Sequence, residues 1–201
     1  MTHSAVLMPL IDTMLSTAAF DKWDIDYIAC SAGPGSFTGL RIGAAAAKGL
    51  AFALSRRIVR VSTLDAMAYN VFNGTGGAGI VVPIMDARRN QVYAALYEAC
   101  GDVPRRLTED LACDFEHIAR LATEVANGLP ITFLGDGCAV HRDKIATMQN
   151  AHIMPIEHCL QRAVAVGALA LQTASHAAMD AADFEPTYVR PSQAEREASK
   201  S

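Results

Sequence analysis

The segment CSAGPGSFTGLRIGAAAAKGLAFAL, residues 30–54, joins an apolar strand to a helix of small residues through a glycine-rich turn. The apolar run at its start predicts a buried strand over Tyr27–Ser31, and a helix is expected over Gly39–Leu54. The turn between them contains Gly33, Pro34, Gly35, Ser36 and Thr38. Glycine allows positive φ angles, and the hydroxyl groups can cap the helix. The turn is therefore interpreted as a hinge that presents a flat helix flank for close packing.

A phosphate-binding role for this turn is disfavoured by the spacing of its residues. A Walker loop ends in Gly-Lys-Ser/Thr, but Gly39 is followed by Leu40, and the first lysine after it is Lys48. The dinucleotide motif G-x-G-x-x-G does not fit either, because Gly33, Gly35 and Gly39 are spaced one residue too widely. The turn is therefore expected to have a structural role.

The order of predicted elements indicates that the chain contains one unit twice. The first half is predicted to contain helices His3–Thr17, Gly39–Leu54 and one begun by the capping pair Ser62 and Asp65, with strands Tyr27–Ser31 and Ile58–Val61. The second half is predicted to contain strands Ile80–Asp86, Gln91–Glu98, Arg105–Leu107, Ile131–Leu134 and His152–Ile156, with helices Asp114–Ala126, Ala139–Met148 and Leu160–Ala177. The second order, βββαβαβα, contains the first, αβαβα, so the first half is interpreted as lacking three leading strands.

Domain boundaries follow from this comparison. Residues 1–78 are expected to form an incomplete N-terminal lobe, residues 79–180 a complete C-terminal lobe, and residues 181–201 an extended tail. The Gly- and Asn-rich sequence NGTGGAG, residues 73–79, is predicted to link the lobes. A strand without its neighbours would expose an apolar edge. Three explanations stay open: a partner covers the edge, the start codon is assigned too late, or the product is truncated.

Several motifs together resemble the TsaB family, also called YeaZ. They are GPGSFTGLRIG at 33–43, VSTLDAMA at 61–68, PIMDARRNQVYAALYE at 83–98, FLGDG at 133–137 and EPTYVRPSQAE at 185–195. The resemblance covers nearly the whole chain and implies a two-lobed α/β fold of the actin-like, ribonuclease-H-like (ASKHA) type. Family members open with β-strands, whereas this chain opens on a predicted helix. This departure agrees with the internal comparison.

The resemblance implies a non-catalytic scaffold that pairs with the catalytic paralogue TsaD in the threonylcarbamoyladenosine modification of tRNA beside the anticodon. No cofactor is expected on this chain alone; ATP and metal are expected on partner subunits, which include the ATPase-like TsaE. A homodimer is the alternative pairing, and tRNA is expected to be met only through the complex. In the family the N-lobe helices pack against the partner. The interface is therefore expected at Leu7, Leu10, Met14, Gly39, Leu40, Gly43, Ala47 and Leu50.

No catalytic or metal-binding residues are predicted. The turn Asp86–Asn90 carries one acid and two arginines, which cannot assemble a nucleotide cleft alone, and no histidine pair has the i, i+4 spacing of a helical metal site. Asp86 is interpreted as a turn residue and Asp136 as a helix cap. The competing hypotheses are a residual nucleotide hydrolase or peptidase of the same fold, and a truncated, non-functional product.

Composition favours a globular protein of the cytoplasm. The 201 residues are 51% hydrophobic, and the net charge of −4 disfavours a free-standing nucleic-acid binder. The five cysteines are odd in number and lack C-x-x-C spacing, which fits a reducing compartment. We expect no secretory signal, because residues 1–15 alternate apolar and polar positions, and no membrane span, because the apolar stretch at residues 163–171 is too short to cross a bilayer.

Overall fold

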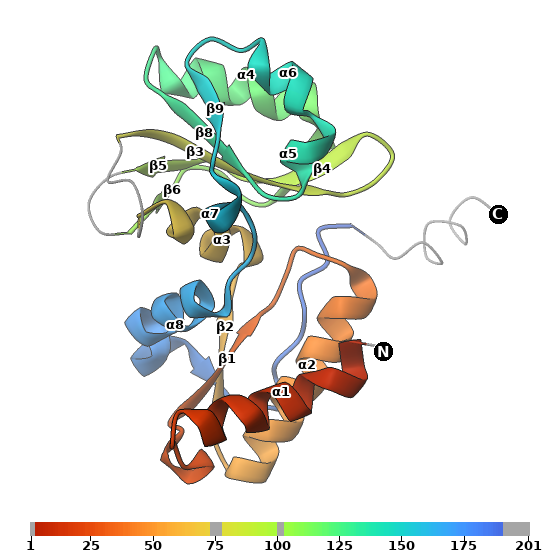
Figure 1. Cartoon of the computed structure of the whole chain (residues 1–201), viewed down its shortest axis with the longest axis vertical. Helices are drawn as coiled ribbons and strands as arrows, with labels where there is room; N and C mark the ends of the chain where they lie inside the picture. The colour runs from red at the N-terminus through yellow and green to blue at the C-terminus, as the bar shows by residue number, and fades with distance from the viewer. Residues whose placement is uncertain (1–2, 73–77, 100–102, 191–201) are drawn as a thin grey trace, which may run out of the picture.

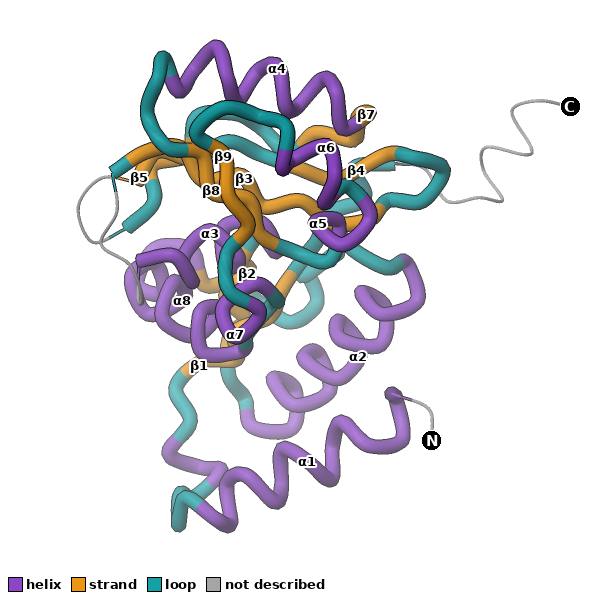
Figure 2. The backbone as a smooth tube through the Cα atoms, turned by 45° about the horizontal axis from the view of Figure 1, so that its top comes forward, coloured by secondary structure: helices purple, strands orange, loops and turns teal. Residues whose placement is uncertain are grey.

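The computed structural model describes residues 3–72, 78–99 and 103–190, which form two β-sheets with helices packed on them (Figure 1). In Figure 1 the lower lobe contains α1, α2, α8 and the smaller sheet, and the upper lobe contains α4 to α6 and the larger sheet. Figure 2 shows the same separation of the strands into two groups. The two-lobed α/β architecture expected from the sequence is therefore present.

The first sheet has the strand order β1-β2-β10. A short 3-10 helix, η1 (Lys22–Asp24), leads into β1 (Tyr27–Ser31), which has the predicted bounds. β1 runs parallel to β2 (Arg57–Val61), and β10 (Ala178–Met179) pairs antiparallel with β2. Within the described residues, no strand pairs with the edge of β1 that faces away from β2.

Helices cover both faces of the first sheet. α2 (Phe37–Leu54) packs on one face, in a cluster that includes Ile58 of β2. α8 (Ala163–Ala177) packs on the other face, in a cluster that includes Val59. Because successive side chains of a strand point to opposite faces, the two helices enclose the sheet between them. α1 (His3–Thr17) has the predicted bounds and lies beside α2 (Figure 2).

The second sheet has seven strands arranged around β3 (Gly79–Asp86). Its other strands are β4 (Gln91–Ala94), β5 (Tyr97–Ala99), β6 (Arg105–Arg106), β7 (Leu111–Asp114), β8 (Ile131–Leu134) and β9 (Ala151–Ile153). β3 pairs antiparallel with β4 and β5, and parallel with β8, which in turn pairs parallel with β9. α4 (Phe115–Ala126) and α3 (Thr63–Phe72) bury their apolar residues in separate clusters on this sheet.

The single helix predicted over Ala139–Met148 is wrong. Two short helices, α5 (Gly137–Val140) and α6 (Arg142–Ala146), occupy this region, and His141 separates them with a φ of −110°. The His141 ring stacks on Phe115, with 4.5 Å between the ring centroids. The break between α5 and α6 therefore coincides with a tertiary contact, which the helix propensity of the local sequence does not indicate.

Other element boundaries also differ from the predictions. The strand predicted over Gln91–Glu98 is interrupted at Ala95 and Leu96, and the Leu96 N–H donates to the Thr108 hydroxyl at 3.0 Å. The strand predicted over His152–Ile156 is the shorter β9, and α8 begins later than predicted, after the one-turn helix α7 (Ile156–Cys159). The short strands β7 and β10 were not predicted.

The C-terminal part of the described chain returns to the first sheet. α8 and β10 pack there, although the predicted boundaries assign them to the second lobe at 79–180. The segment after β10 also packs against the protein, and Phe184 is only 1% exposed. Residues 73–77 of the predicted linker and residues 191–201 of the predicted tail lie outside the described residues. The domain boundaries themselves stay predictions.

Candidate interface groove and interlobe cleft

An apolar groove of about 470 Å³ runs beside the edge of β1 that has no partner strand in the described part of the chain. α1 contributes Leu7 and Ile11 to its wall, and α8 contributes Val166 and Gly167. β1 contributes Cys30, where burial raises the thiol pKa to about 11. The thiol therefore stays protonated at neutral pH and acts as a small apolar side chain, as the sequence suggested.

Most of the residues predicted for the interface meet at this groove. Its lining includes Leu7, Gly39, Leu40, Gly43, Ala47 and Leu50. Leu10 and Met14 do not line it; they are 62% and 60% exposed on α1. The fold thus gathers the predicted residues of α1 and α2 on one side of the molecule, and their role as an interface stays a prediction.

The glycines of α2 leave open space, while its alanines provide the close packing. A Cβ atom at Gly43 or Gly49 would meet nothing within 4 Å. Ala44, Ala47 and Ala51 are buried in the cluster of the first sheet. Gly43 borders the groove and Gly49 does not. Because Gly43 has no side chain, α2 leaves the groove open at this position.

The glycine-rich turn after β1 is held against the C-terminal segment. Gly33 has a φ of +119°, and a Cβ atom there would lie 2.5 Å from the carbonyl oxygen of Thr187. The Thr187 N–H donates to the Ala32 carbonyl oxygen at 2.6 Å. Ser36 is the N-cap of α2, and its Oγ accepts from the Gly39 N–H at 3.3 Å. Glycine is thus required at position 33 by both backbone angle and close approach.

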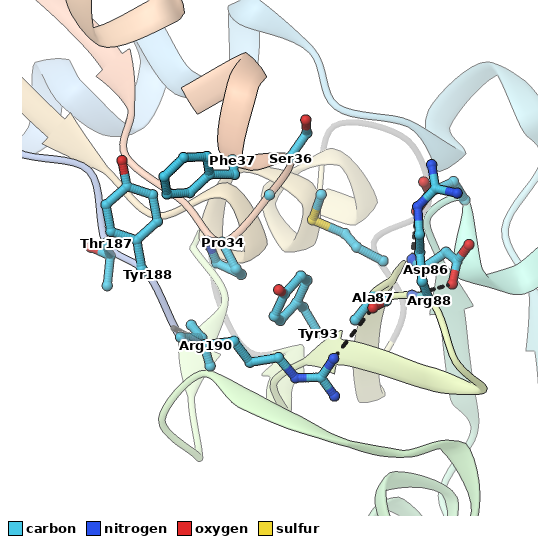
Figure 3. Close-up of a pocket in the computed structure, with 14 residues that line it drawn as sticks. Pro34, Ser36, Phe37, Asp86, Ala87, Arg88, Tyr93, Thr187, Tyr188 and Arg190 are labelled. Carbon is cyan, nitrogen blue, oxygen red and sulfur yellow. Dashed lines mark hydrogen bonds between the residues drawn. The ribbon is translucent and has the colours of Figure 1, made fainter. Parts of the chain in front are cut away.

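A second cavity, also of about 470 Å³, separates this turn from the β3–β4 turn of the second sheet (Figure 3). Pro34 and Gly35 line it from the first lobe, and Asp86 and Arg88 line it from the second. Thr38 is exposed on the first turn of α2 and is absent from this lining. The cavity, hereafter the interlobe cleft, has charges of both signs.

The C-terminal segment contacts both lobes at the interlobe cleft. The rings of Phe37 and Tyr188 have centroids 5.0 Å apart, and the Arg41 guanidinium lies 4.1 Å from the Phe37 centroid. Arg190 Nη1 donates to the Ala87 carbonyl oxygen at 3.3 Å (Figure 3). Sequence analysis placed Tyr188 and Arg190 in an extended tail and missed these contacts, because they join residues far apart in the chain.

Both acids of the interlobe cleft accept hydrogen bonds from backbone amides. Asp136 Oδ1 accepts from the Asp86 N–H at 3.1 Å, and Asp86 Oδ1 accepts from the Arg88 N–H at 2.8 Å. Asp86 thus acts as a turn residue. The predicted cap at Asp136 is wrong, since its side chain makes no cap bond to α5 and instead holds β3. In the residues that the structure describes, no group of three His, Cys, Asp or Glu side chains could hold a metal ion.

The chain is similar to curated proteins described as tRNA threonylcarbamoyladenosine biosynthesis protein TsaB. TsaB of Bacillus subtilis (strain 168) is 34% identical over 143 residues, which make up 71% of this chain and 60% of that protein. TsaB of Haemophilus influenzae is 40% identical over 92 residues, or 46% of this chain and 39% of that protein. The chain thus matches less than two thirds of the length of either relative.

A family model described as TsaD, tRNA N6-adenosine threonylcarbamoyltransferase, matches residues 1–198. The chain belongs to the TsaD family, in its TsaB (YeaZ) group. The resemblance carried by the sequence motifs is therefore confirmed.

Solved structures of YeaZ-type proteins share the fold of this TsaB-group chain. A crystal structure from Pseudomonas aeruginosa, described as an uncharacterized protein with similarity to peptidase YEAZ, superimposes with a TM-score of 0.79 at 27% identity. The match covers 94% of this chain and 85% of that one. A structure of YeaZ from Pseudomonas aeruginosa gives the same TM-score at 26% identity. The expected actin-like fold is therefore confirmed.

Within the part of the chain that the structure describes, one helix, α2, is long and apolar enough to span a membrane by length and composition, with a mean hydropathy of 1.2 over 18 residues. Core helices of soluble proteins pass the same test, so this property is a weak indication. In the structure the buried alanines of α2 pack on the first sheet. The sequence-based prediction of no membrane span rests on the short apolar stretch at residues 163–171, which belongs to α8 and not to α2.

Proposed function

We propose that this chain is a non-catalytic scaffold subunit in the threonylcarbamoyladenosine modification of tRNA, and that it pairs with the catalytic paralogue TsaD. The names of its TsaB relatives support the pathway. The observation that carries the scaffold role is the apolar groove beside β1, with exposed Leu10 and Met14 nearby on α1. Contiguous apolar surface of this kind marks protein interaction sites.

The interlobe cleft supports the non-catalytic part of this proposal. Asp86 accepts a hydrogen bond from the Arg88 N–H within its own turn, Asp136 accepts one from the Asp86 N–H of β3, and Arg190 donates to the Ala87 carbonyl oxygen. These contacts give the polar groups of the interlobe cleft a structural role, so we propose that the chain acts by binding partners. We place ATP and metal chemistry on the partner subunits TsaD and TsaE, contact with tRNA in the complex, and the complex in the cytoplasm. A homodimer through α1 and α2 is the alternative assembly.

The substitution Gly43→Trp tests the interface. An indole at position 43 projects into open space in the groove, so it should block the partner without disturbing the fold. Gly49→Trp is the matched control, because it adds the same side chain to the same helix, also into open space but outside the groove. Co-purification with TsaD should be lost at Gly43→Trp and kept at Gly49→Trp. Equal recovery of TsaD with both variants would show that the interface lies elsewhere.

A further inference from the structure

The β3–β4 turn carries two arginine side chains at the interlobe cleft that the fold itself does not use. Arg88 lines the cleft, Arg89 follows it in the turn, and both are exposed. In the part of the chain that the structure describes, neither guanidinium has a hydrogen bond or an ion pair. The contacts of Arg88 with the turn are made by its backbone, whose N–H donates to Asp86 Oδ1 and whose carbonyl oxygen accepts from the Gln91 N–H. The two positive charges are therefore available to a ligand.

The backbone of this turn favours other residues at the arginine positions. Arg88, Arg89 and Asn90 have φ angles of +60°, +56° and +59°. Positive φ is unfavourable for arginine, and hairpin turns with this backbone usually carry Asn or Gly. The two arginines thus lower the stability of the turn in which they lie. Because strained residues cluster at binding sites, the strain and the unpaired charges point to the same role.

Aromatic rings form the wall of the cleft opposite this turn (Figure 3). Phe37 is 37% exposed, and Tyr188, which lies against it, is 41% exposed. Arg41 adds a third positive charge beside these rings. Exposed rings next to arginines bind nucleic-acid strands, because the bases stack on the rings and the guanidinium groups attract the phosphates.

The two acids of the cleft distinguish among negatively charged ligands. Asp86 and Asp136 each use Oδ1 to accept a backbone N–H, and their Oδ2 atoms have no partner among the described residues. These carboxylates would repel an acidic peptide, but they can accept hydrogen bonds from the amino groups of an unpaired base. A double helix hides those base edges from side chains. A single strand is therefore the nucleic acid that matches the arginines, the rings and the carboxylates together.

We infer that the interlobe cleft binds single-stranded RNA, with phosphates at Arg88 and Arg89 and one base against Tyr188. The inference deepens the proposed function, because it rests on an RNA substrate and places a contact with that substrate on this chain. A cavity of about 470 Å³ has the size of a small-molecule site, so it admits one nucleotide while the strand continues along the exposed turn. The net charge of −4 predicts weak, strongly salt-dependent binding by the chain alone.

Fluorescence anisotropy with a labelled single-stranded RNA of about eight nucleotides tests the site on the isolated full chain. Arg88→Asn/Arg89→Gly places the usual residues in the turn, so it should raise the midpoint of urea unfolding and yet weaken RNA binding roughly tenfold or more. Arg57→Gln/Arg120→Gln is the matched control, because it removes as much charge from exposed positions outside the cleft lining. The control should weaken binding about twofold or less. Equal weakening by both double variants would overturn the inference in favour of unspecific charge attraction.

Tyr188 tests the stacking of a base. Tyr188→Leu keeps an apolar side chain beside Phe37 and removes the ring, so it should weaken RNA binding about fivefold or more. Tyr188→Phe keeps the ring and should retain the affinity. Unchanged binding by Tyr188→Leu, or an equal loss in both variants, would overturn the assignment of a base to this ring.

Competing ligands separate RNA from other occupants of the cleft. Unlabelled single-stranded RNA should displace the probe at a concentration roughly tenfold or more below that needed with ATP, duplex RNA or a polyglutamate peptide. Displacement by any of these three as readily as by the single strand would overturn the inference in favour of that ligand. Gly43→Trp, which lies in the groove and not in the cleft, should keep the RNA affinity of the isolated chain. Failure to pair with TsaD would therefore count against the proposed scaffold and leave the RNA measurement as it stands.

Discussion

Gly33 and Gly43 differ in whether the structure has room for a side chain at their positions. Alanine at position 33 must adopt a φ of +119° with its Cβ 2.5 Å from the Thr187 carbonyl oxygen. Gly33→Ala should therefore lower the free energy of unfolding by about 2 kcal/mol. Gly43→Ala, in a helix with open space beside it, should raise this free energy by about 0.5–1 kcal/mol. Urea unfolding measures both signs, and a fully stable Gly33→Ala protein would contradict the close approach of Thr187.

His141 should make the protein less stable in mild acid. Burial, followed by the nearby Lys144 charge, lowers the pKa of its ring below the usual value. The unfolded chain then binds a proton near pH 6.5 while the folded chain resists it, so stability is lost as the pH falls from about 6.5 toward the lower folded pKa. His141→Phe, which can keep the stacking on Phe115, should lose less stability than the parent between pH 7 and pH 5, roughly the range of this titration. Identical pH profiles from urea unfolding would contradict this role.

At the scale of elements, α3 shows how tertiary contacts complete a local signal. The predicted pair Ser62 and Asp65 is half present, since Ser62 Oγ accepts from the Asp65 N–H at 3.4 Å. The Asp65 carboxylate serves another purpose: Oδ1 accepts from the Tyr97 hydroxyl at 2.6 Å and from Arg106 Nη1 at 3.1 Å. Asp65 therefore ties α3 to β5 and β6, which lie far away in the sequence.

Arg106 should be the key residue of this tie. It also contacts Asp110, where burial is the main cause that raises the carboxyl pKa. Arg106→Leu removes the cation between two acids and should cost about 2 kcal/mol of unfolding free energy, less at low pH where the carboxylates are protonated. Arg105→Leu is the matched control; it breaks the more exposed pair with Glu98 and should cost about 0.5 kcal/mol. If urea unfolding gave equal losses of unfolding free energy for Arg106→Leu and Arg105→Leu, the partial burial of Arg106 would not strengthen its ion pairs.

The elements also show which parts of the fold local sequence determines. α1 and β1 have their predicted bounds because apolar periodicity and the glycine-rich turn define them locally. β10 has two residues and depends on pairing with β2, so no local pattern reveals it. The break between α5 and α6 coincides with the stacking of His141 on Phe115. Both features coincide with contacts to residues distant in the sequence, and the local sequence did not predict either of them.

At the scale of the whole molecule, the segment from Phe184 to Arg190 connects the two lobes. Phe184 is buried in the core of the first sheet, and Tyr188 lies against Phe37 of α2. Arg190 reaches the Ala87 carbonyl oxygen in the second lobe. The near end of this segment thus belongs to the first lobe, and its far end crosses the interlobe cleft.

The two ends of this segment should respond differently to truncation of side chains. Phe184→Ala creates a core cavity and should cost about 3–4 kcal/mol of unfolding free energy. Arg190→Ala should cost about 1 kcal/mol or less but speed amide exchange at Ala87 and Gln91, because the β3–β4 turn is released. Unfolding and hydrogen exchange measure the two effects. Unchanged exchange at the turn would show that Arg190 does not hold the lobes together.

The sequence by itself determined the family and the glycine-rich turn, because these depend on local backbone preferences and on motif spacing. Most of the residues predicted for the interface also lie in the groove, since α1 and α2 carry them on periodic faces, whereas the lining from β1 and α8 was not predicted. Only the tertiary structure decided that Gly33 meets Thr187, that α8 closes the first sheet, and that Asp136 holds β3 instead of capping α5. Each of these contacts joins segments far apart in the chain, so the local sequence pattern does not reveal the free energy that it contributes.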